Sequence, residues 1–478
     1  MEKRAVNRVL LAGTGSGSGK TTITCGILNC LQKRGLMPAS FKCGPDYIDS
    51  MFHSRVLDIP TGNLDSFFSD RTVLNQLLLE NSKGKDIAII EGVMGYYDGI
   101  GFLEKGSSKE IAELTKTPVV LIVNCKGMSN SIGALLKGFV SYRSPSLIKG
   151  VIFNRLSPGL YEGAKQLAKE NGLMPLGYLP PLKNELFQSR HLGLVTAEEI
   201  EGFREKIEEL SNELEKTVDI PGLLQLAQKA ELIEGQAVQS FSEESDSGRQ
   251  VKDSHKETEL QAPVIAIARD HAFCFLYKDN VDYLKRAGCE IKYFSPLKDK
   301  SLPAGTSGLI LSGGYPELYA KELSENYPLR EEINRVVLQG MPCIAECGGF
   351  LYLHEGLVDE SGVEYPMAGV VHGKCFPAGR LSRFGYITME AKEGGLLCEK
   401  GAFLTAHEFH YWESQHPGSS FHAVKPGNGK SWEAALMTES LYAGFPHLYF
   451  YSNEKAAKRF IKQAGQYSRT QKEKERKA

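Results

Sequence analysis

The 478-residue sequence lacks any apolar run long enough to cross a membrane. Its longest apolar stretches, such as residues 119–123, are far shorter than the ~20 residues that a transmembrane helix needs. It also lacks an excess of either charge, since 56 Lys and Arg nearly balance 58 Asp and Glu. These two absences argue against a membrane protein and against broad electrostatic binding of nucleic acid or an anionic bilayer.

Paired cysteines are absent as well. Ten cysteines are scattered along the chain without a C-x-x-C pair, a pattern typical of reduced thiols and not of a disulfide framework or a zinc site. The first residues, MEKRAVNRVLL, lack the apolar core and cleavage site of a signal peptide and lead directly into a predicted strand. We therefore expect a cytoplasmic protein.

The length and the order of segments predict two α/β domains. Near-continuous apolar runs, such as residues 86–92 and 117–125, alternate with helical segments, as expected for parallel strands buried on both faces. A polar, charged stretch then interrupts the pattern and predicts a disordered linker. The fold class is therefore α/β, with two doubly wound, mostly parallel-sheet domains. The predicted parts are a first domain at 1–236, the linker at 237–262, a second domain at 263–465 and a charged tail at 466–478.

The first chemical signal is the stretch LAGTGSGSGKTT at residues 11–22, between a predicted strand and a predicted helix. Glycines let successive backbone N–H groups converge on one phosphate, and the helix N-terminus adds partial positive charge. The lysine reaches β- and γ-phosphates, and the threonine hydroxyl ligates Mg²⁺. The sequence thus predicts an ATP-binding P-loop, with a spacing one residue longer than the common motif. The predicted nucleotide-binding residues here are Gly15, Gly17, Gly19, Lys20 and Thr21.

A P-loop site needs a carboxylate at the end of a neighbouring strand to hold Mg²⁺. Glu91 ends the apolar run DIAIIEG and fits this role, together with the Thr21 hydroxyl. Asp49, in KCGPDYIDS, is a second candidate metal ligand. The sequence therefore predicts a magnesium site formed by Thr21, Asp49 and Glu91.

Three further polar residues lie at predicted strand ends. Lys42 is expected to neutralise charge as a phosphoryl group moves. Asp46 and Asp98 are predicted to contact the nucleotide, because ligands of such sheets bind at the carboxyl ends of the strands. A purely structural role for Asp46 and Asp49, as turn residues around a proline, stays open.

The second chemical signal is MPCIAECGGF, an apolar strand that leads into Glu-Cys-Gly-Gly and a helical segment. This is the arrangement of a nucleophile elbow, in which Gly348 and Gly349 allow a sharp turn. A helix start is expected to stabilise the Cys347 thiolate, and Gly313 with Gly314, at another strand end, would form an oxyanion hole. The alternative is that Cys347 is a buried structural cysteine.

A thiol nucleophile needs a base, and three histidines are candidates: His407, His410 and His447. The first two lie in the segment HEFH, which is one residue shorter than the H-E-x-x-H motif of zinc proteases, so a metal site is not expected there. From the residues alone, the choice among the three stays open.

These motifs together resemble the family of cobyrinic acid a,c-diamide synthases, in which a dethiobiotin-synthetase-like P-loop domain is fused to a class I glutamine amidotransferase domain. The resemblance implies that Cys347 attacks the glutamine side-chain amide and that His447 raises its nucleophilicity. Many class I amidotransferases have Glu two residues after this His, but here Tyr449 occupies the position, and Glu408 is one candidate replacement. The motifs are AGTGSGSGKTT, FKCGPDYIDSMFH, NLDSFF, EGVMGYYDG, RHLGL, IARDHAFCFLY, LSGGYPEL, AECGGF, SRFGY, HEFHY and the His447 segment.

The resemblance also implies a reaction. ATP would phosphorylate side-chain carboxylates of a cobyrinate-like tetrapyrrole, and ammonia from L-glutamine would displace phosphate at the a and c positions, with Mg²⁺ as cofactor. Related substrates, hydrogenobyrinate or nickel-sirohydrochlorin, stay open, as do amidation of the remaining corrin side chains and a P-loop switch protein with an inactive amidotransferase-like domain. The expected partners are small molecules, neither nucleic acid nor a membrane, and the oligomeric state is open, a homo-oligomer included.

Overall fold

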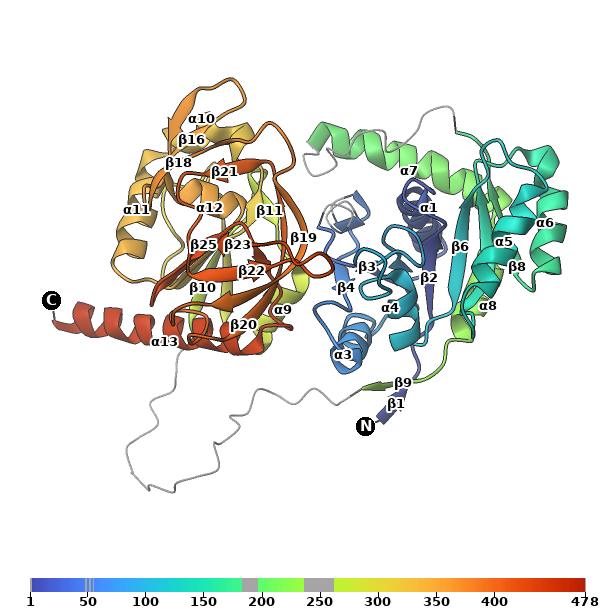
Figure 1. The fold of residues 1–478 in the computed structure, drawn as a ribbon, viewed down its shortest axis with the longest axis horizontal. Helices are drawn as coiled ribbons and strands as arrows, with labels where there is room; N and C mark the ends of the chain where they lie inside the picture. Colours follow the sequence, from blue (N-terminus) through green and yellow to red (C-terminus); the bar gives the residue numbers. More distant parts are fainter. Residues whose placement is uncertain are drawn as a thin grey trace. The chain divides into compact units, whose positions relative to one another are not determined.

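The structure, a computed structural model, describes residues 2–47, 50, 53–54, 56–182, 197–235 and 262–477. The chain divides into two compact units, Met1–Ala237 and Val238–Ala478 (Figure 1). Asp49, the RHLGL motif at 190–194 and the predicted linker, apart from its last residue, lie outside the described residues. Among the helices that are described, none combines the length and the apolar character needed to span a bilayer.

The first unit is built on seven parallel strands in the order β4-β3-β5-β2-β6-β7-β8. The chain leaves β2 first toward one edge of the sheet and later returns to add β6 on its other side, so β2 lies at the point where ligands of open α/β sheets bind. The strands are β2 (Arg8–Gly13), β3 (Pro38–Cys43), β4 (Thr61–Leu64), β5 (Ile87–Glu91), β6 (Val119–Asn124), β7 (Ile148–Asn154) and β8 (Met174–Leu179).

Helices cover both faces of this sheet (Figure 1). Val9, Ile89 and Val120 point to one face and share a core with α1, α7 and α8. Leu10 and Ile90, one residue further along their strands, are also fully buried but belong to the opposite face. The helices of the unit are α1 (Lys20–Lys33), α3 (Arg71–Asn81), α4 (Ser108–Leu114), α5 (Ser131–Ser141), α6 (Tyr161–Glu170), α7 (Ala197–Thr217) and α8 (Ile220–Gln228). A short antiparallel pair, β1 (Glu2–Arg4) with β9 (Ile233–Gly235), joins the two ends of the unit.

The second unit contains a six-stranded sheet in the order β12-β10-β13-β15-β25-β24, parallel except for its last pair. The two doubly wound, mostly parallel sheets confirm the predicted fold class. The strands are β10 (Val264–Ala268), β12 (Glu290–Phe294), β13 (Thr306–Leu311), β15 (Cys343–Glu346), β24 (Leu436–Met437) and β25 (Leu441–Gly444), and the helices are α9 (Lys278–Arg286), α10 (Ala320–Glu325), α11 (Tyr327–Leu338), α12 (Gly348–Leu353) and α13 (Glu454–Lys477).

Residues 354–448 add two smaller sheets, one antiparallel and one mixed, that the sequence did not predict. One five-stranded sheet runs β23-β22-β19-β20-β26, and one four-stranded sheet runs β17-β16-β18-β21. Their strands are β16 (His354–Val358), β17 (Glu364–Pro366), β18 (Val371–Pro377), β19 (Arg383–Ala391), β20 (Phe403–His410), β21 (Trp412–Ser414), β22 (Phe421–Val424), β23 (Ser431–Ala434) and β26 (His447–Leu448), with a further pair β11 (Phe273–Phe275) and β14 (Gly313–Gly314). The charged C-terminal segment is not a separate coil, because α13 continues through it to Lys477.

Candidate active sites

The P-loop forms the predicted turn between β2 and α1. Gly19 directly precedes α1 with φ 91°, a left-handed conformation that favours glycine. A Cβ at Gly19 would also lie 2.0 Å from Nδ2 of Asn154. That amide donates a hydrogen bond to the Ser18 carbonyl at 2.9 Å, so Asn154, at the end of β7, holds the loop in place. The sequence reading missed this role, although a polar residue ending an apolar strand is the same signal that identified Glu91.

Lys20 folds back over the loop that precedes it. Its ammonium group donates hydrogen bonds to the carbonyls of Gly15, at 3.2 Å, and Met94, at 2.5 Å. Met94 belongs to the turn after β5 and has φ 46°. The cation is thus held between two strand-end turns, where an anionic ligand of the loop would meet it.

Glu91 is the centre of a buried polar network beside the P-loop. One of its carboxylate oxygens accepts hydrogen bonds from the Thr21 hydroxyl and the Lys42 ammonium, each at 2.7 Å. The other lies 3.3 Å from Nε2 of His53. Burial alone would raise the pKa of Glu91, but the charge of Lys42 and the interactions with His53 outweigh it and hold the pKa well below its usual range. The structure therefore brings Thr21, Lys42 and Glu91 together, as predicted, and adds His53.

The remaining predicted residues of this site occupy different positions. The Asp46 carboxylate lies 3.9 Å from the Lys42 ammonium, at the edge of the network. Asp98 accepts a hydrogen bond from the Gly95 N–H at 2.9 Å, within the turn after β5. That contact gives Asp98 a local structural role, and its contact with a nucleotide stays a prediction. Asp49 lies outside the described residues.

In the second unit, Cys347 forms the turn between β15 and α12. Its backbone has φ 47° and ψ −103°, which is strained for a residue with a side chain. The strain falls on the cysteine itself and not on the following glycines, in contrast to the sequence expectation. Two backbone hydrogen bonds hold the turn. The Cys347 N–H donates to the Gly444 carbonyl at 2.8 Å, and the Leu351 N–H donates to the Cys347 carbonyl at 2.9 Å.

The two glycines after Cys347 allow close packing. A Cβ at Gly349 would lie 2.1 Å from the Leu311 carbonyl, and one at Gly348 would lie 2.9 Å from the backbone nitrogen of Gly314. A Cβ at Gly313 would lie 2.4 Å from Cε1 of His447. The Gly313–Gly314 strand thus packs against both the cysteine turn and His447, and its role as an oxyanion hole stays a prediction.

The Cys347 thiol is only 6% exposed. Burial raises its pKa well above the usual range, and the nearby carboxylate of Glu317 adds to the shift, whereas the Gly348 N–H opposes it. The expected stabilisation of the thiolate by the helix start is therefore outweighed by burial. The group rests as a neutral thiol, and a base must remove its proton during any reaction.

Strand pairing brings His447 close to Glu346, and its role as the base stays a prediction. Strand β25 pairs with β15, so that Gly444 lies opposite Glu346, and His447 follows three residues later. Its Nδ1 lies 3.6 Å from a carboxylate oxygen of Glu346. The other oxygen of Glu346 accepts the Leu448 N–H at 2.9 Å, which fixes the carboxylate. Glu346, the residue directly before the cysteine, was not among the predicted site residues.

The other candidates have different surroundings. His407 lies opposite His447 across the β20–β26 pair, and burial first, then His447, lowers its pKa to about 3. His410 stacks on the Phe445 ring at 3.8 Å, and burial lowers its pKa to about 4. Both imidazoles are therefore neutral near pH 7.

Two further residues concern the third member of the catalytic triad: Glu408, the candidate replacement, and Tyr449, which occupies the position of the usual Glu. Glu408 alternates with His407 along β20 and so points to the opposite face from the residue paired with His447. The Tyr449 hydroxyl donates a hydrogen bond to Asp279 at 3.0 Å. Neither side chain takes the position next to His447 that Glu346 occupies.

Comparisons with known proteins agree with this two-site architecture. A family model described as a CobQ/CobB/MinD/ParA nucleotide binding domain matches residues 9–189, and a CobB/CobQ-like glutamine amidotransferase domain matches residues 264–455. A cobyrinate a,c-diamide synthase of Caldanaerobacter subterraneus subsp. tengcongensis is 37% identical over 96% of this chain and 99% of its own length. Proteins of the same name are 35% identical in Thermoplasma volcanium, over 97% and 98% of the two chains, and 37% identical in Salmonella typhimurium, over 92% and 94%.

Proposed function

The chain belongs to the cobyrinate a,c-diamide synthase family of ATP-using, glutamine-dependent amidating ligases, and we propose that it amidates the a and c side-chain carboxylates of a cobyrinate-like tetrapyrrole. One observation carries the proposal: a single chain that matches its relatives along its length holds both a P-loop site around Glu91 and a strained, buried cysteine whose neighbour Glu346 has a carboxylate oxygen 3.6 Å from Nδ1 of His447. The first suits phosphoryl transfer, and the second suits release of ammonia from glutamine.

In the P-loop domain, Lys20 would contact the β- and γ-phosphates of ATP, and Lys42 would balance charge as the substrate carboxylate takes up the γ-phosphoryl group. The residues present fit a magnesium ion: the Thr21 hydroxyl and the Glu91 carboxylate are hard oxygen donors 2.7 Å apart. One Glu91 oxygen accepts no hydrogen bond within the described part of the chain. Thr21 and Glu91 would hold the ion, which would neutralise phosphate charge.

In the amidotransferase domain, the Cys347 sulfur would attack the glutamine amide carbon while His447 accepts the thiol proton. The tetrahedral oxyanion would be stabilised by backbone N–H groups at Gly313 and Gly314. Collapse of that intermediate gives a glutamyl thioester and releases ammonia, with the proton returned from His447. Glu346 would keep His447 in the tautomer with its proton on Nδ1, as a positioning residue. Ammonia then attacks the acyl phosphate, forming the amide and releasing phosphate.

The test is to incubate the full-length protein with ATP, Mg²⁺, glutamine and one of three tetrapyrroles: cobyrinate, hydrogenobyrinate or nickel-sirohydrochlorin. Mass spectrometry counts the amides formed, and NMR of the product locates them. We expect two amides, at the a and c positions, on cobyrinate. Amidation of one of the other rings in preference would reassign the substrate, and amides at other side chains would reassign the position. Active glutaminase without amidation of any of the three would reject the proposal.

A further inference from the structure

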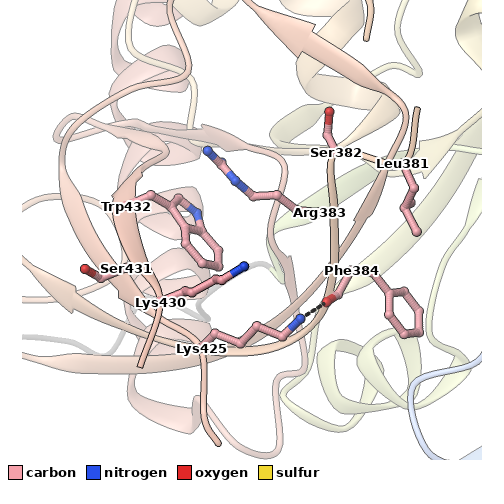
Figure 2. Close-up of a pocket in the computed structure, with 8 residues that line it drawn as sticks. All are labelled: Leu381, Ser382, Arg383, Phe384, Lys425, Lys430, Ser431 and Trp432. Atoms are coloured by element: carbon pink, nitrogen blue, oxygen red, sulfur yellow. Dashed lines mark hydrogen bonds between the residues drawn. The ribbon is translucent and has the colours of Figure 1, made fainter. Parts of the chain in front are cut away.

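A solvent-accessible cavity of 540 Å³ lies on the five-stranded sheet of the second unit, between the start of β19 and the turn that joins β22 to β23. Its size is in the range of small-molecule sites. Figure 2 shows the side chains that surround it. They are Leu381, Ser382, Arg383, Phe384, Lys425, Lys430, Ser431 and Trp432. Three of these residues, Ser382–Phe384, belong to the SRFGY motif of the sequence.

Three of the lining residues are cations: Arg383, Lys425 and Lys430. Within the described ranges, no carboxylate oxygen lies within 4.0 Å of any of them. Lys425 donates a hydrogen bond to the Phe384 carbonyl at 2.7 Å, which holds its ammonium group at the cavity (Figure 2). Burial raises to about 7 the pKa of Glu408, the carboxyl on which Arg383 and Lys425 act electrostatically. The cavity therefore carries positive charge that the protein compensates only weakly, and it favours an anionic ligand.

One aromatic side chain, Trp432, gives the cavity a flat apolar surface. The Arg383 guanidinium lies over the Trp432 ring, 4.7 Å from its centre, which orients both groups. Phe384, the next residue along β19, borders the cavity with its backbone carbonyl, whereas its ring points toward Phe409 and His407, at ring-centre distances of 5.7 Å and 5.6 Å. Cations around an aromatic face match a ligand that is both planar and polyanionic. A tetrapyrrole with carboxylate side chains has this chemistry, and so does a nucleotide.

The cavity is also close to the cysteine in the fold. Phe384, in its wall, pairs directly with Phe409 across β19 and β20. The carbonyl of Phe409 lies 3.8 Å from the Cys347 sulfur. One strand therefore separates the cavity wall from the thiol where ammonia would be released.

We propose that this cavity binds the carboxylate-bearing edge of the tetrapyrrole that accepts ammonia. Arg383 and Lys425 would pair with its side-chain carboxylates, and Trp432 would contact the ring. A tetrapyrrole is favoured over a nucleotide because the P-loop already supplies an ATP site. This inference rests on the proposed function, to which it adds a substrate-binding site on the amidotransferase domain.

The test is equilibrium dialysis of the full-length protein against uroporphyrin, a tetrapyrrole with a carboxylate on every side chain, and in parallel against ATP. The double variant Arg383→Gln, Lys425→Gln should bind uroporphyrin about tenfold or more weakly, because two charge-assisted contacts are lost. Its ATP affinity should match that of the wild type. The single variant Lys430→Gln, at an exposed position that does not affect folding, should weaken uroporphyrin binding by about threefold.

The matched control is Lys392→Gln. Lys392 follows the end of β19 on the same sheet but pairs with Glu433, at 2.7 Å, outside the cavity.

Equal uroporphyrin affinity in the control and the double variant would overturn the inference, as would absence of binding to the wild type. Loss of ATP affinity in the double variant would reassign the cavity to a nucleotide. If the wild type amidates a tetrapyrrole while both variants bind uroporphyrin normally, only this inference fails. If uroporphyrin binding depends on Arg383 and Lys425 but no tetrapyrrole is amidated, only the proposed function fails.

Discussion

Glu91 and Glu408 are both buried carboxylates, one in each unit, yet their surroundings shift the two pKa values in opposite directions. Glu91 is fully buried but contacts Thr21, Lys42 and His53, and its pKa is lowered. Both oxygens of Glu408 lack a hydrogen-bond partner within the described residues, and burial raises its pKa to about 7. Burial is common to both groups, so the partners decide the direction.

The P-loop site and the cysteine site also differ in the charge of their buried groups. The P-loop site keeps a charged carboxylate beside two lysines, an arrangement suited to phosphates and a metal ion. The cysteine site instead holds two of its groups neutral: burial raises the pKa of Cys347 and lowers that of His407 to about 3. A neutral thiol becomes charged only when a base removes its proton, which limits its side reactions. The P-loop site therefore holds permanently charged groups that can bind a charged ligand, whereas the Cys347 thiol becomes charged only during the reaction.

The largest effect is expected for Lys20→Ala. The variant removes the cation held between Gly15 and Met94, so ATP-dependent amidation should be abolished, whatever the source of ammonia. Glutaminase activity should survive, because the thiol belongs to the other unit. Product formation and glutamate release are measured in parallel. Amidation at a near wild-type rate would show that the loop does not bind the reacting phosphates.

Cys347→Ala should separate the two sites. Glutamine-dependent amidation should be lost by several orders of magnitude, because no thioester can form. Amidation from a high concentration of ammonium salt should remain, because carboxylate activation requires only the P-loop domain. His447→Asn should show the same pattern with a smaller loss. A folded Cys347→Ala variant that binds ATP but cannot use ammonium would contradict the division into two independent sites.

The P-loop and the elbow could be predicted from sequence because each places its signal in consecutive residues. Strand, glycines, lysine and threonine stand together at residues 11–22, and strand, cysteine and glycines stand together at 341–350. The partners of these groups could not be predicted in the same way. His53 reaches Glu91 from a separate segment, and His447 meets Glu346 only because β25 pairs with β15. Such contacts depend on strand register, which the local pattern does not encode.

One glycine variant in the cysteine turn and one in the P-loop should show how tightly other atoms pack against each turn. A Cβ at Gly349 would overlap the Leu311 carbonyl at 2.1 Å, so Gly349→Ala should displace the elbow and reduce glutaminase activity by about tenfold or more. A Cβ at Gly15 would meet nothing within 4 Å. Gly15→Ala should therefore keep wild-type stability, within about 0.5 kcal/mol, and raise only the KM for ATP. Thermal melts and steady-state kinetics check both. An unaltered ATP KM would remove Gly15 from the nucleotide site.

Glu346→Gln should have a more moderate effect. The amide is nearly isosteric and can still accept the Leu448 N–H, but it cannot stabilise a protonated His447. We expect kcat/KM for glutamine hydrolysis to fall by about ten- to a hundredfold and the acidic limb of its pH profile to shift to lower pH, because the protonated form of the His447 base loses the carboxylate that favours it. Ammonium-dependent amidation should be unchanged. Glu346→Asp should recover part of the activity. A uniform loss at every pH would indicate a structural role only.

The smallest effect is expected for Glu408→Gln, and it concerns stability. The folded protein holds the Glu408 proton up to a pKa of about 7, whereas the ordinary value is 4.5. The native state therefore binds more protons than the unfolded chain between these values, and stability falls as pH rises through that interval. The loss is complete above about pH 7 and absent below about pH 4.5, with an upper limit of ~3 kcal/mol. Glu408→Gln does not titrate, so its Tm relative to wild type should be several degrees higher at pH 8 than at pH 5. Glu390→Gln, an exposed change in the same sheet, is the control and should show no such difference. Equal pH dependence in the wild type and Glu408→Gln would mean that Glu408 finds a compensating partner, and the contrast with Glu91 would then disappear.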